Sequence, residues 1–226
     1  MYEARDSVYC YPGTNTLVNK LNIRDANKLD NYEKSMVALK LMALEKKGIT
    51  GNFDVAHFVG IHKFLFEDIY PFAGLFRSEN IAKGYFQFAQ WEYIDSELAR
   101  LLTQLRNEKL DNLSQEDFAK RLAYYWSELN VLHPFREGNG RTTREFIRQI
   151  ALKYNYNLNL QNFTAQEILD ASIKSIVDTK DLENIVNKYM QIRKQHAAPS
   201  SNELAVIMHV NGKDKPLGTN IKTLVQ

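Results

Sequence analysis

The chain has 226 residues, of which 44% are hydrophobic, and this is enough to bury the core of one domain with a small appendage. Its formal net charge of +2 gives no reason to expect nucleic acid or another polyanion as the main partner. A single cysteine, Cys10, excludes an internal disulfide and favours a reducing compartment. The sequence contains no run of about twenty apolar residues, so we expect no membrane insertion.

Two helices are predicted in the first third of the chain. After an irregular lead-in around Pro12, apolar residues recur at three- and four-residue steps across 25–47, which predicts a helix that Gly48 ends. A second helix is predicted over 54–69, before Pro71 breaks the chain. The expected apolar faces are formed by Leu29, Tyr32, Met36, Leu39, Met42 and Ala43 in the first helix and by Phe58, Ile61, Leu65 and Ile69 in the second.

Residues 78–91 differ from their surroundings because they contain few helix formers and gather apolar and aromatic residues around Gly84. This composition is typical of a short hairpin or flap. An ordinary surface loop is an equally good interpretation of these residues alone.

Five more helices are predicted in the rest of the chain. They cover about 92–107, then 115–132 after a cap at Ser114, a stretch from near Gly140, about 165–175 after a capping box at Thr164, and 181–195. The second of them should end at the His133–Pro134 step, because the residue before a proline avoids helical angles. Their expected core residues are Phe118, Leu122, Tyr125, Trp126, Leu129 and Leu132, followed by Phe146, Ile147, Ile150 and Tyr154.

The C-terminal end has the composition of a linker followed by a strand. Residues 197–202 are rich in small residues, and 204–210 form an apolar run before an Asn211-Gly212 turn. This piece is too short to fold alone, so it is either an addition to the helical body or the first part of a following domain. We predict one helical domain at 1–196, with its core at about 50–195, and a linker with a strand-like tail at 197–226.

The segment HPFREGNGRTTR, at residues 133–144, concentrates the chemistry of the chain. A helix, a sharp turn and a second helix place the amides of Gly138, Asn139 and Gly140 at a helix N-terminus, where unpaired N–H groups bind phosphate oxygens. Arg141 and Arg144 project from the same side of the first turn, and each can fork onto phosphate oxygens. Two arginines with free amides suggest a nucleoside di- or triphosphate.

Two further side chains of this segment suit catalysis. Glu137 is a hard oxygen ligand at the edge of the turn, and Mg²⁺ is bound by one or two carboxylates plus substrate phosphates. His133 ends the preceding helix, and its unperturbed pKa of about 6.5 suits a general base at neutral pH. Each residue alone is usually structural, but their combination within one short segment predicts a phosphate-transfer site.

This segment resembles the motif of the Fic (filamentation induced by cyclic AMP) family, H-x-F-x-[D/E]-G-N-G-R-x-x-R, at every fixed position. The resemblance extends to Tyr11-Pro12-Gly13-Thr14, to Phe72-Ala73-Gly74 with Arg77, and to residues 80–84, so it covers about 8–195. It implies an all-α helical bundle, with the motif in a loop between two central helices and a short β-hairpin flap.

The resemblance also implies a role for each residue of the site. His133 takes the proton from a Tyr, Thr or Ser hydroxyl of a target protein, and Glu137 holds Mg²⁺. Arg141 grips the β-phosphate and Arg144 the γ-phosphate of ATP. The other nucleotide-binding residues are Gly138, Asn139 and Gly140, which cradle the α- and β-phosphates, and Phe135, which is expected to pack into the core and fix the turn. The target-binding flap is formed by Ile81, Ala82, Lys83, Gly84, Tyr85 and Phe86.

Many Fic proteins are inhibited by a helix with the pattern [S/T]-x-x-x-E-[G/N], whose glutamate pairs with the second arginine of the motif. Only residues 179–184, TKDLEN, fit this pattern. Glu183 would then be an internal inhibitory glutamate, but Thr179 is more simply the cap of the last helix, so we favour a chance match. We therefore expect a separate small antitoxin, as in the toxin–antitoxin and secreted-effector branch of the family.

The function that the resemblance implies is AMP transfer from ATP, with Mg²⁺, to a hydroxyl side chain of a target protein. One alternative keeps the fold and uses another donor, so that UMP or phosphocholine is transferred. Another is an inhibited toxin module bound to its antitoxin. The expected location is the bacterial cytoplasm, or a host cell after secretion as an effector.

Overall fold

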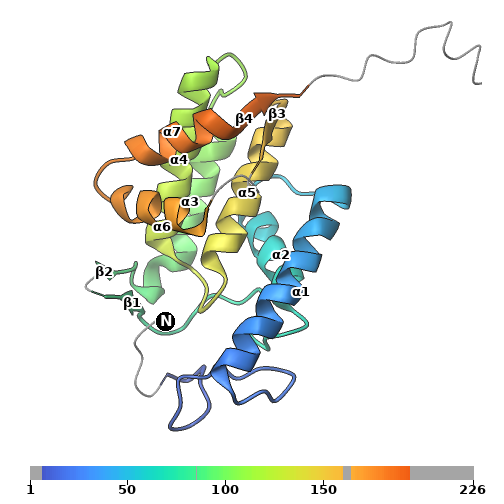
Figure 1. Cartoon of the computed structure of the whole chain (residues 1–226). Helices are drawn as coiled ribbons and strands as arrows, with labels where there is room; N and C mark the ends of the chain where they lie inside the picture. The colour runs from blue at the N-terminus through green and yellow to red at the C-terminus, as the bar shows by residue number, and fades with distance from the viewer. Residues whose placement is uncertain (1–6, 85, 160–163, 194–226) are drawn as a thin grey trace, which may run out of the picture. The chain divides into compact units, whose positions relative to one another are not determined.

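A computed structural model of the chain describes residues 7–84, 86–159 and 164–193. These residues form seven α-helices, one short 3-10 helix and two antiparallel two-stranded sheets (Figure 1). The predicted all-α fold with a short hairpin is therefore confirmed. Residues 193–226 make up a separate unit, and the linker and tail predicted at 197–226 lie outside the described residues. No helix in the described part of the chain is long and apolar enough to cross a membrane.

Helices α1 (Ala26–Lys47) and α2 (Val55–Phe66) begin at the predicted positions, because an aspartate caps each of them. The side chain of Asp25 accepts from the amide of Lys28, and that of Asp54 accepts from the amide of His57. Gly48 ends α1 with φ of 65°, a backbone conformation that glycine adopts without strain. Helix α2 ends at Phe66, three residues before the predicted boundary at Ile69.

The buried face of α1 is only partly the predicted one, because Leu29 is buried and Tyr32 and Met36 pack partly against the core as expected, while the later positions do not. Leu29, Val37 and Leu44 are buried, whereas Leu39 and Met42 are 62% and 56% exposed. Apolar residues occur on more than one side of this helix, so their spacing alone does not select the face that packs against α2. Glu33 lies on the buried face, one helical turn from both Leu29 and Val37, and is 6% exposed.

Residues 78–91 form the predicted hairpin rather than a loop. Strand β1 (Ala82–Lys83) pairs with β2 (Phe86–Gln87), so that Ala82 lies opposite Gln87. Gly84 in the connecting turn has φ of 59°. The chain then continues through the 3-10 helix η1 (Trp91–Tyr93) into α3 (Ile94–Asn107), which corresponds to the predicted helix at 92–107.

Helices α4 (Gln115–Leu132) and α5 (Asn139–Lys153) lie at the centre of the bundle (Figure 1). Helix α4 packs against α3, α5 and α7, and α5 packs against α2 as well. Ser114 caps α4 by accepting from the amide of Asp117, as predicted. The predicted core residues of α4 are all buried, namely Phe118, Leu122, Tyr125, Trp126, Leu129 and Leu132.

The C-terminal part of the bundle departs from the prediction after residue 189. Helix α6 (Ala165–Lys174) follows the expected capping box at Thr164, but α7 (Lys180–Tyr189) is shorter than the predicted helix at 181–195. The chain continues as strand β4 (Met190–Ile192), which pairs with β3 (Tyr156–Leu158) after α5. Leu158 and Met190 lie opposite each other and are both buried, so a long-range contact decides where this helix ends.

Candidate active site

His133 directly follows α4 as its C-cap and adopts an unusual backbone conformation. Its φ of 47° and ψ of 59° place it in the left-handed region, which is strained for a residue with a side chain. The proline that follows prevents the helix from continuing, and the left-handed step turns the chain toward α5. Such strain is common at functional sites, where the surrounding structure holds it in place.

The imidazole of His133 is held in one tautomer. Its Nδ1 lies 3.0 Å from the carbonyl oxygen of Asn130, and because a carbonyl can only accept, Nδ1 carries the proton. The ring stacks on Phe88, with centroids 3.8 Å apart. Burial, together with the positive charges of Arg77 and Lys83, lowers the pKa of His133 to about 3. The ring is therefore neutral at physiological pH, with a lone pair on Nε2.

The turn between α4 and α5 requires its glycine and uses its asparagine internally. Gly138 has φ of 82°, and a Cβ built there would lie 2.3 Å from the ring of Phe66, so only glycine fits. The side chain of Asn139 accepts from the amide of Phe135 at 2.8 Å and donates to its carbonyl at 2.7 Å. Because its side chain is used within the turn, Asn139 can contribute only its main chain to the predicted cradle.

Helix α5 begins at Asn139 without a side-chain cap. The amides of its first turn are thus available to an anion, as predicted from the sequence, while the amide of Gly138 itself donates to Oε1 of Glu137 at 2.9 Å. Phe135 is fully buried and stacks on His62, at 3.7 Å between ring centroids, so it fixes the turn from beneath.

The two arginines of the motif have different surroundings. Arg141 lies over the ring of Phe66 and pairs through Nη2 with Oε1 of Glu33 at 2.5 Å. Burial and the charge of Arg141 lower the pKa of Arg144 to about 10. Among the residues that the structure describes, no carboxylate lies within 4.0 Å of Arg144. A buried cation without a carboxylate partner attracts an anion strongly.

Glu137 lies at the edge of the turn, where the sequence predicted a metal ligand. Its Oε1 is 3.4 Å from Nη2 of Arg141, and burial together with the charge of Glu33 raises the pKa of its carboxyl. A cation bound there would stabilise the ionised form, so the donor set fits Mg²⁺. The described residues contain no group of three or more potential metal ligands, so phosphate oxygens and water would have to supply most of the coordination.

Two cavities of about 530 Å³ each meet at the turn, and Gly140 and Arg144 line both of them. The first is polar and is lined by both arginines of the motif and by Glu33, Tyr70 and Glu137. The second is largely apolar and extends from His133 between the flap and α6. Its walls include Phe86, Phe88, Trp126, Ile168, Leu169 and Ile173.

The flap is fastened beside His133 by its flanking residues. Arg77 donates to the carbonyls of Glu79 and Ala89, at the two ends of the hairpin, and to the carbonyl of His133. Of the predicted flap residues, Ile81 is buried, Ala82, Lys83 and Phe86 lie in the paired strands, and Gly84 is in the turn, while Tyr85 lies outside the described residues.

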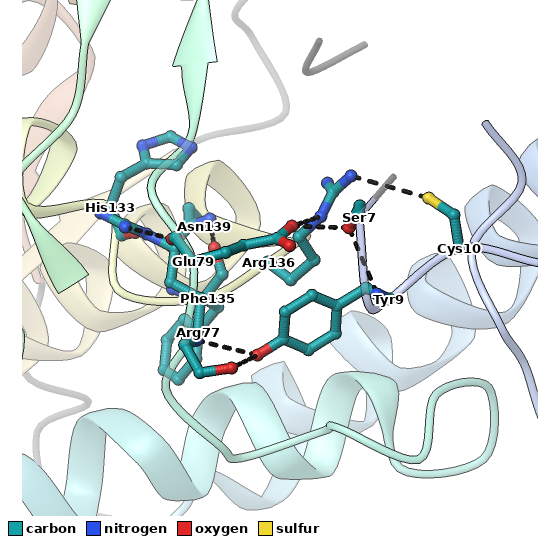
Figure 2. Close-up of polar contacts among 10 residues, drawn as sticks. Ser7, Tyr9, Cys10, Arg77, Glu79, His133, Phe135, Arg136 and Asn139 are labelled. Atoms are coloured by element: carbon teal, nitrogen blue, oxygen red, sulfur yellow. Dashed lines mark hydrogen bonds and ion pairs between the residues drawn. The ribbon is translucent and has the colours of Figure 1, made fainter. Parts of the chain in front are cut away.

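The N-terminal residues Ser7 and Tyr9 contact the segment that leads into the flap. Figure 2 shows the carboxylate of Glu79 between Ser7 and Arg136: the Ser7 hydroxyl donates to it at 2.6 Å, and Arg136 pairs with it at 3.1 Å. The hydroxyl of Tyr9 accepts from the amide of Ser78 at 2.9 Å. Segments far apart in the sequence therefore converge behind the motif.

Three side chains that position the site were missed from the sequence. Arg77 belongs to the family resemblance without a role of its own there, and Glu33 and His62 are not among the predicted site residues. His62 accepts from the amide of Gly74 at Nδ1 and donates through Nε2 to the carbonyl of Glu137 at 3.0 Å. One sequence signal could have identified Glu33. It is a carboxylate four residues from both Leu29 and Val37, on the face of the helix that is otherwise apolar and buried.

The segment with the inhibitory pattern makes local contacts. Thr179 precedes α7, but its hydroxyl donates to Oε1 of Glu183 at 2.7 Å and does not cap a helix amide. Lys180 lies 3.7 Å from the same carboxylate. Glu183 thus has partners within its own helix turn, which agrees with the interpretation that the match to the inhibitory pattern is coincidental.

Comparison with known proteins identifies the family. Residues 52–151 match the model of the Fic/DOC family. Protein adenylyltransferase VbhT of Bartonella schoenbuchensis is 39% identical over 182 residues, which cover 80% of this chain but only 38% of that longer protein. Probable protein adenylyltransferase y4lH of Sinorhizobium fredii is 36% identical over 176 residues, covering 77% of this chain and 90% of that protein. The chain belongs to the Fic/DOC family, and both of these relatives carry the name protein adenylyltransferase.

Solved structures agree with this assignment. The BepC protein of Bartonella tribocorum, a VirB-translocated effector with bound AMPPNP, superposes with a TM-score of 0.77 at 27% identity, over 82% of this chain and 97% of that chain. The N-terminal Fic domain of an effector from Bartonella quintana, with bound ADP, gives the same TM-score and identity over 82% of this chain and 95% of that chain.

Proposed function

We propose that this chain transfers AMP from ATP to a hydroxyl side chain of a target protein, with His133 as general base. The observation that carries the proposal is the position of a neutral histidine, fixed as the Nδ1–H tautomer, in the wall of the largely apolar cavity. Arg144 lines that cavity as well as the adjoining polar one. The family assignment and the names of the curated relatives support the same reaction.

The chemistry follows from the tautomer. The lone pair on Nε2 of His133 accepts the proton of the target hydroxyl as its oxygen attacks the α-phosphorus of ATP. A bond forms between that oxygen and phosphorus, the bond from the α-phosphorus to the bridging oxygen breaks, and pyrophosphate leaves. The depressed pKa of His133 keeps the ring unprotonated before the attack.

The nucleotide fits the two cavities with its phosphates at their junction. Arg141, Arg144 and the amides of the first turn of α5 hold the phosphates in the polar cavity. The base and ribose extend into the apolar cavity beside Trp126 and α6, because a purine favours aromatic and aliphatic walls. Phe135 acts beneath the turn and does not contact the nucleotide.

Glu137 is the protein ligand for Mg²⁺ at the phosphates. When bound, the metal neutralises phosphate charge and favours departure of pyrophosphate. The carboxylate already accepts from the amide of Gly138, which fixes its orientation toward the polar cavity.

The hairpin at 81–86 aligns the target. An extended segment of the target pairs with an edge of this hairpin, so that main-chain hydrogen bonds position a Tyr, Thr or Ser without demanding much of the neighbouring sequence. Lys83 and Phe86 line the cavity that also contains His133, so a segment docked there lies close to the base.

Inhibition is supplied by a separate small protein. Glu183 is engaged by Thr179 and Lys180, and in the described part of the chain no carboxylate pairs with Arg144, so a partner is free to provide one. The test is co-purification with a small protein that carries the Ser-x-x-x-Glu pattern. The chain acts in the bacterial cytoplasm or, like its effector relatives, in a host cell.

A panel of donors tests the reaction. Purified protein incubated with Mg²⁺, a lysate and ATP should give a product heavier by AMP in tryptic mass spectrometry, and UTP or CDP-choline should give none. His133→Ala should lower the rate about 10²–10⁴-fold. Equal labelling by wild type and His133→Ala would exclude His133 as the base. A product that carries UMP or phosphocholine would show that the donor is UTP or CDP-choline and not ATP.

A further inference from the structure

We propose that Glu33 of α1 is a positioning residue for AMP transfer, which orients Arg141 toward the phosphates of the nucleotide. This inference rests on the proposed function and adds to it a residue that lies outside the matched family segment at 52–151. Helix α1 would then be part of the active site rather than only a cover for the bundle.

The guanidinium of Arg141 is fixed on two sides. Its central carbon lies over the ring of Phe66, 4.9 Å from the ring centroid. Its Nη2 lies 2.5 Å from Oε1 of Glu33 and 3.4 Å from Oε1 of Glu137. Carboxylates thus engage one corner of the guanidinium. Among the described residues its other nitrogens donate no hydrogen bond, and these nitrogens form the edge that a phosphate needs.

Glu33 is itself held rigidly, as a positioning group must be. It is 6% exposed, and Tyr70 donates its hydroxyl to Oε2 while Oε1 faces Arg141. Burial and the charge of Glu33 raise the pKa of Tyr70, so the phenol keeps the proton that it donates. The series of contacts from Tyr70 through Glu33 to Arg141 therefore holds in one rotamer an arginine that would otherwise have several.

The alternative is that Glu33 competes with the phosphates for Arg141. The geometry favours orientation, because the carboxylate meets only one nitrogen of the fork and Phe66 fixes the plane. The two roles predict opposite changes in rate. Loss of an orienting group slows transfer, whereas loss of a competitor speeds it.

The experiment compares Glu33→Gln with wild type in steady-state AMP transfer. Glutamine keeps the size of the side chain but weakens the bond to Arg141, so kcat should fall on the order of 10-fold, the scale on which orienting partners act. The KM for ATP should not rise, because a negative charge next to the triphosphate has been removed. Tyr70→Phe should lower kcat in the same direction by a smaller factor.

Two further variants separate orientation from general effects. Glu67→Gln removes a carboxylate that pairs with Lys40 of α1 and not with Arg141, and its kcat should equal that of wild type. In an Arg141→Ala background, Glu33→Gln should cause no further loss of kcat, because the group that it orients is gone. Thermal unfolding and binding of a non-hydrolysable ATP analogue check that each variant is folded.

The outcomes are distinct. If wild type transfers no AMP, the proposed function fails before Glu33 is tested. If wild type is active and folded Glu33→Gln has unchanged or higher kcat, the positioning role is wrong. An equal loss of kcat from Glu33→Gln with and without Arg141 would also overturn it, since Glu33 would then act through another group.

Discussion

Nε of Arg77 donates to the main-chain carbonyl of His133 at 2.8 Å. The same buried guanidinium bonds the carbonyl of Glu79 at 2.7 Å and that of Ala89 at 2.5 Å, at the two ends of the flap. One side chain therefore joins the hairpin expected to align the target to the peptide that carries the base. It also stabilises the strained left-handed conformation of His133.

Replacement of Arg77 by lysine should uncouple the flap from the base. Lysine keeps the charge but cannot reach three carbonyls with a planar fork, so kcat/KM for the target protein should fall about 10–100-fold. Affinity for an ATP analogue should change much less, because the phosphates contact the turn and α5. Initial rates at several target concentrations, together with calorimetric titration of the analogue, measure both effects.

Arg100→Lys is the matched control, since this exposed arginine on α3 makes one side-chain bond to Glu97. It should behave as wild type. Hydrogen exchange of the flap amides should accelerate in Arg77→Lys alone. Unchanged exchange and an unchanged rate with target would show that the hairpin is held without Arg77.

The stability of the fold should fall in mild acid because two buried histidines resist protonation. Burial lowers the pKa of His62 to about 4 and that of His133 to about 3, against about 6.5 in an unfolded chain. Below pH 6.5 the unfolded state therefore binds more protons than the folded state, and the free energy of unfolding decreases as pH falls. Each histidine contributes about 1.4 kcal/mol per pH unit in this window.

Urea unfolding between about pH 7 and about pH 5 tests this expectation. Carboxylates contribute to the same trend, so the informative quantity is the difference between wild type and His133→Ala. The variant should lose less stability on acidification, by up to about 1.4 kcal/mol per pH unit. Parallel pH profiles for the two proteins would mean that His133 is protonated equally readily in both states.

Gly138→Ala should disrupt both the turn and the fold. An added Cβ meets the Phe66 ring at 2.3 Å, in a backbone conformation that alanine avoids, so the free energy of unfolding should fall by roughly 2 kcal/mol or more. Gly60→Ala is the control, because that helical glycine has open space around its Cβ, and it should stabilise α2 by up to about 1 kcal/mol. Thermal unfolding of both variants distinguishes a local steric effect from general intolerance of alanine.

Arg144→Ala should weaken nucleotide binding. The guanidinium lies at the junction of the two cavities, and its lowered pKa of about 10 leaves it charged at neutral pH. Loss of one charge-assisted contact to a phosphate should raise the Kd for ATP on the order of 10–100-fold. Calorimetric titration with ATP and with AMP provides the comparison, and an equal loss for both ligands would place Arg144 away from the terminal phosphates.

Much of the fold was predictable because its signals are local. Asp25, Asp54, Ser114 and Thr164 cap helices at the expected residues, and the apolar spacing of α4 identified its buried face. The hairpin around Gly84 is different, because the sequence left it level with an ordinary loop and the strand pairing decided it. The other features are local. Each of these features depends on residues within one or two helical turns, so the sequence by itself determined them.

The sequence also determined the identity of the family and the location of the proposed active site, since the motif at 133–144 is continuous in the chain. What it could not supply was the set of partners that hold the motif. The carbonyl contacts of Arg77, the pairing of Glu33 with Arg141 and the end of α7 at β4 all join segments far apart in sequence. Such contacts leave no periodic signal, because they form only when packing brings the segments together, and so only the tertiary structure decided them.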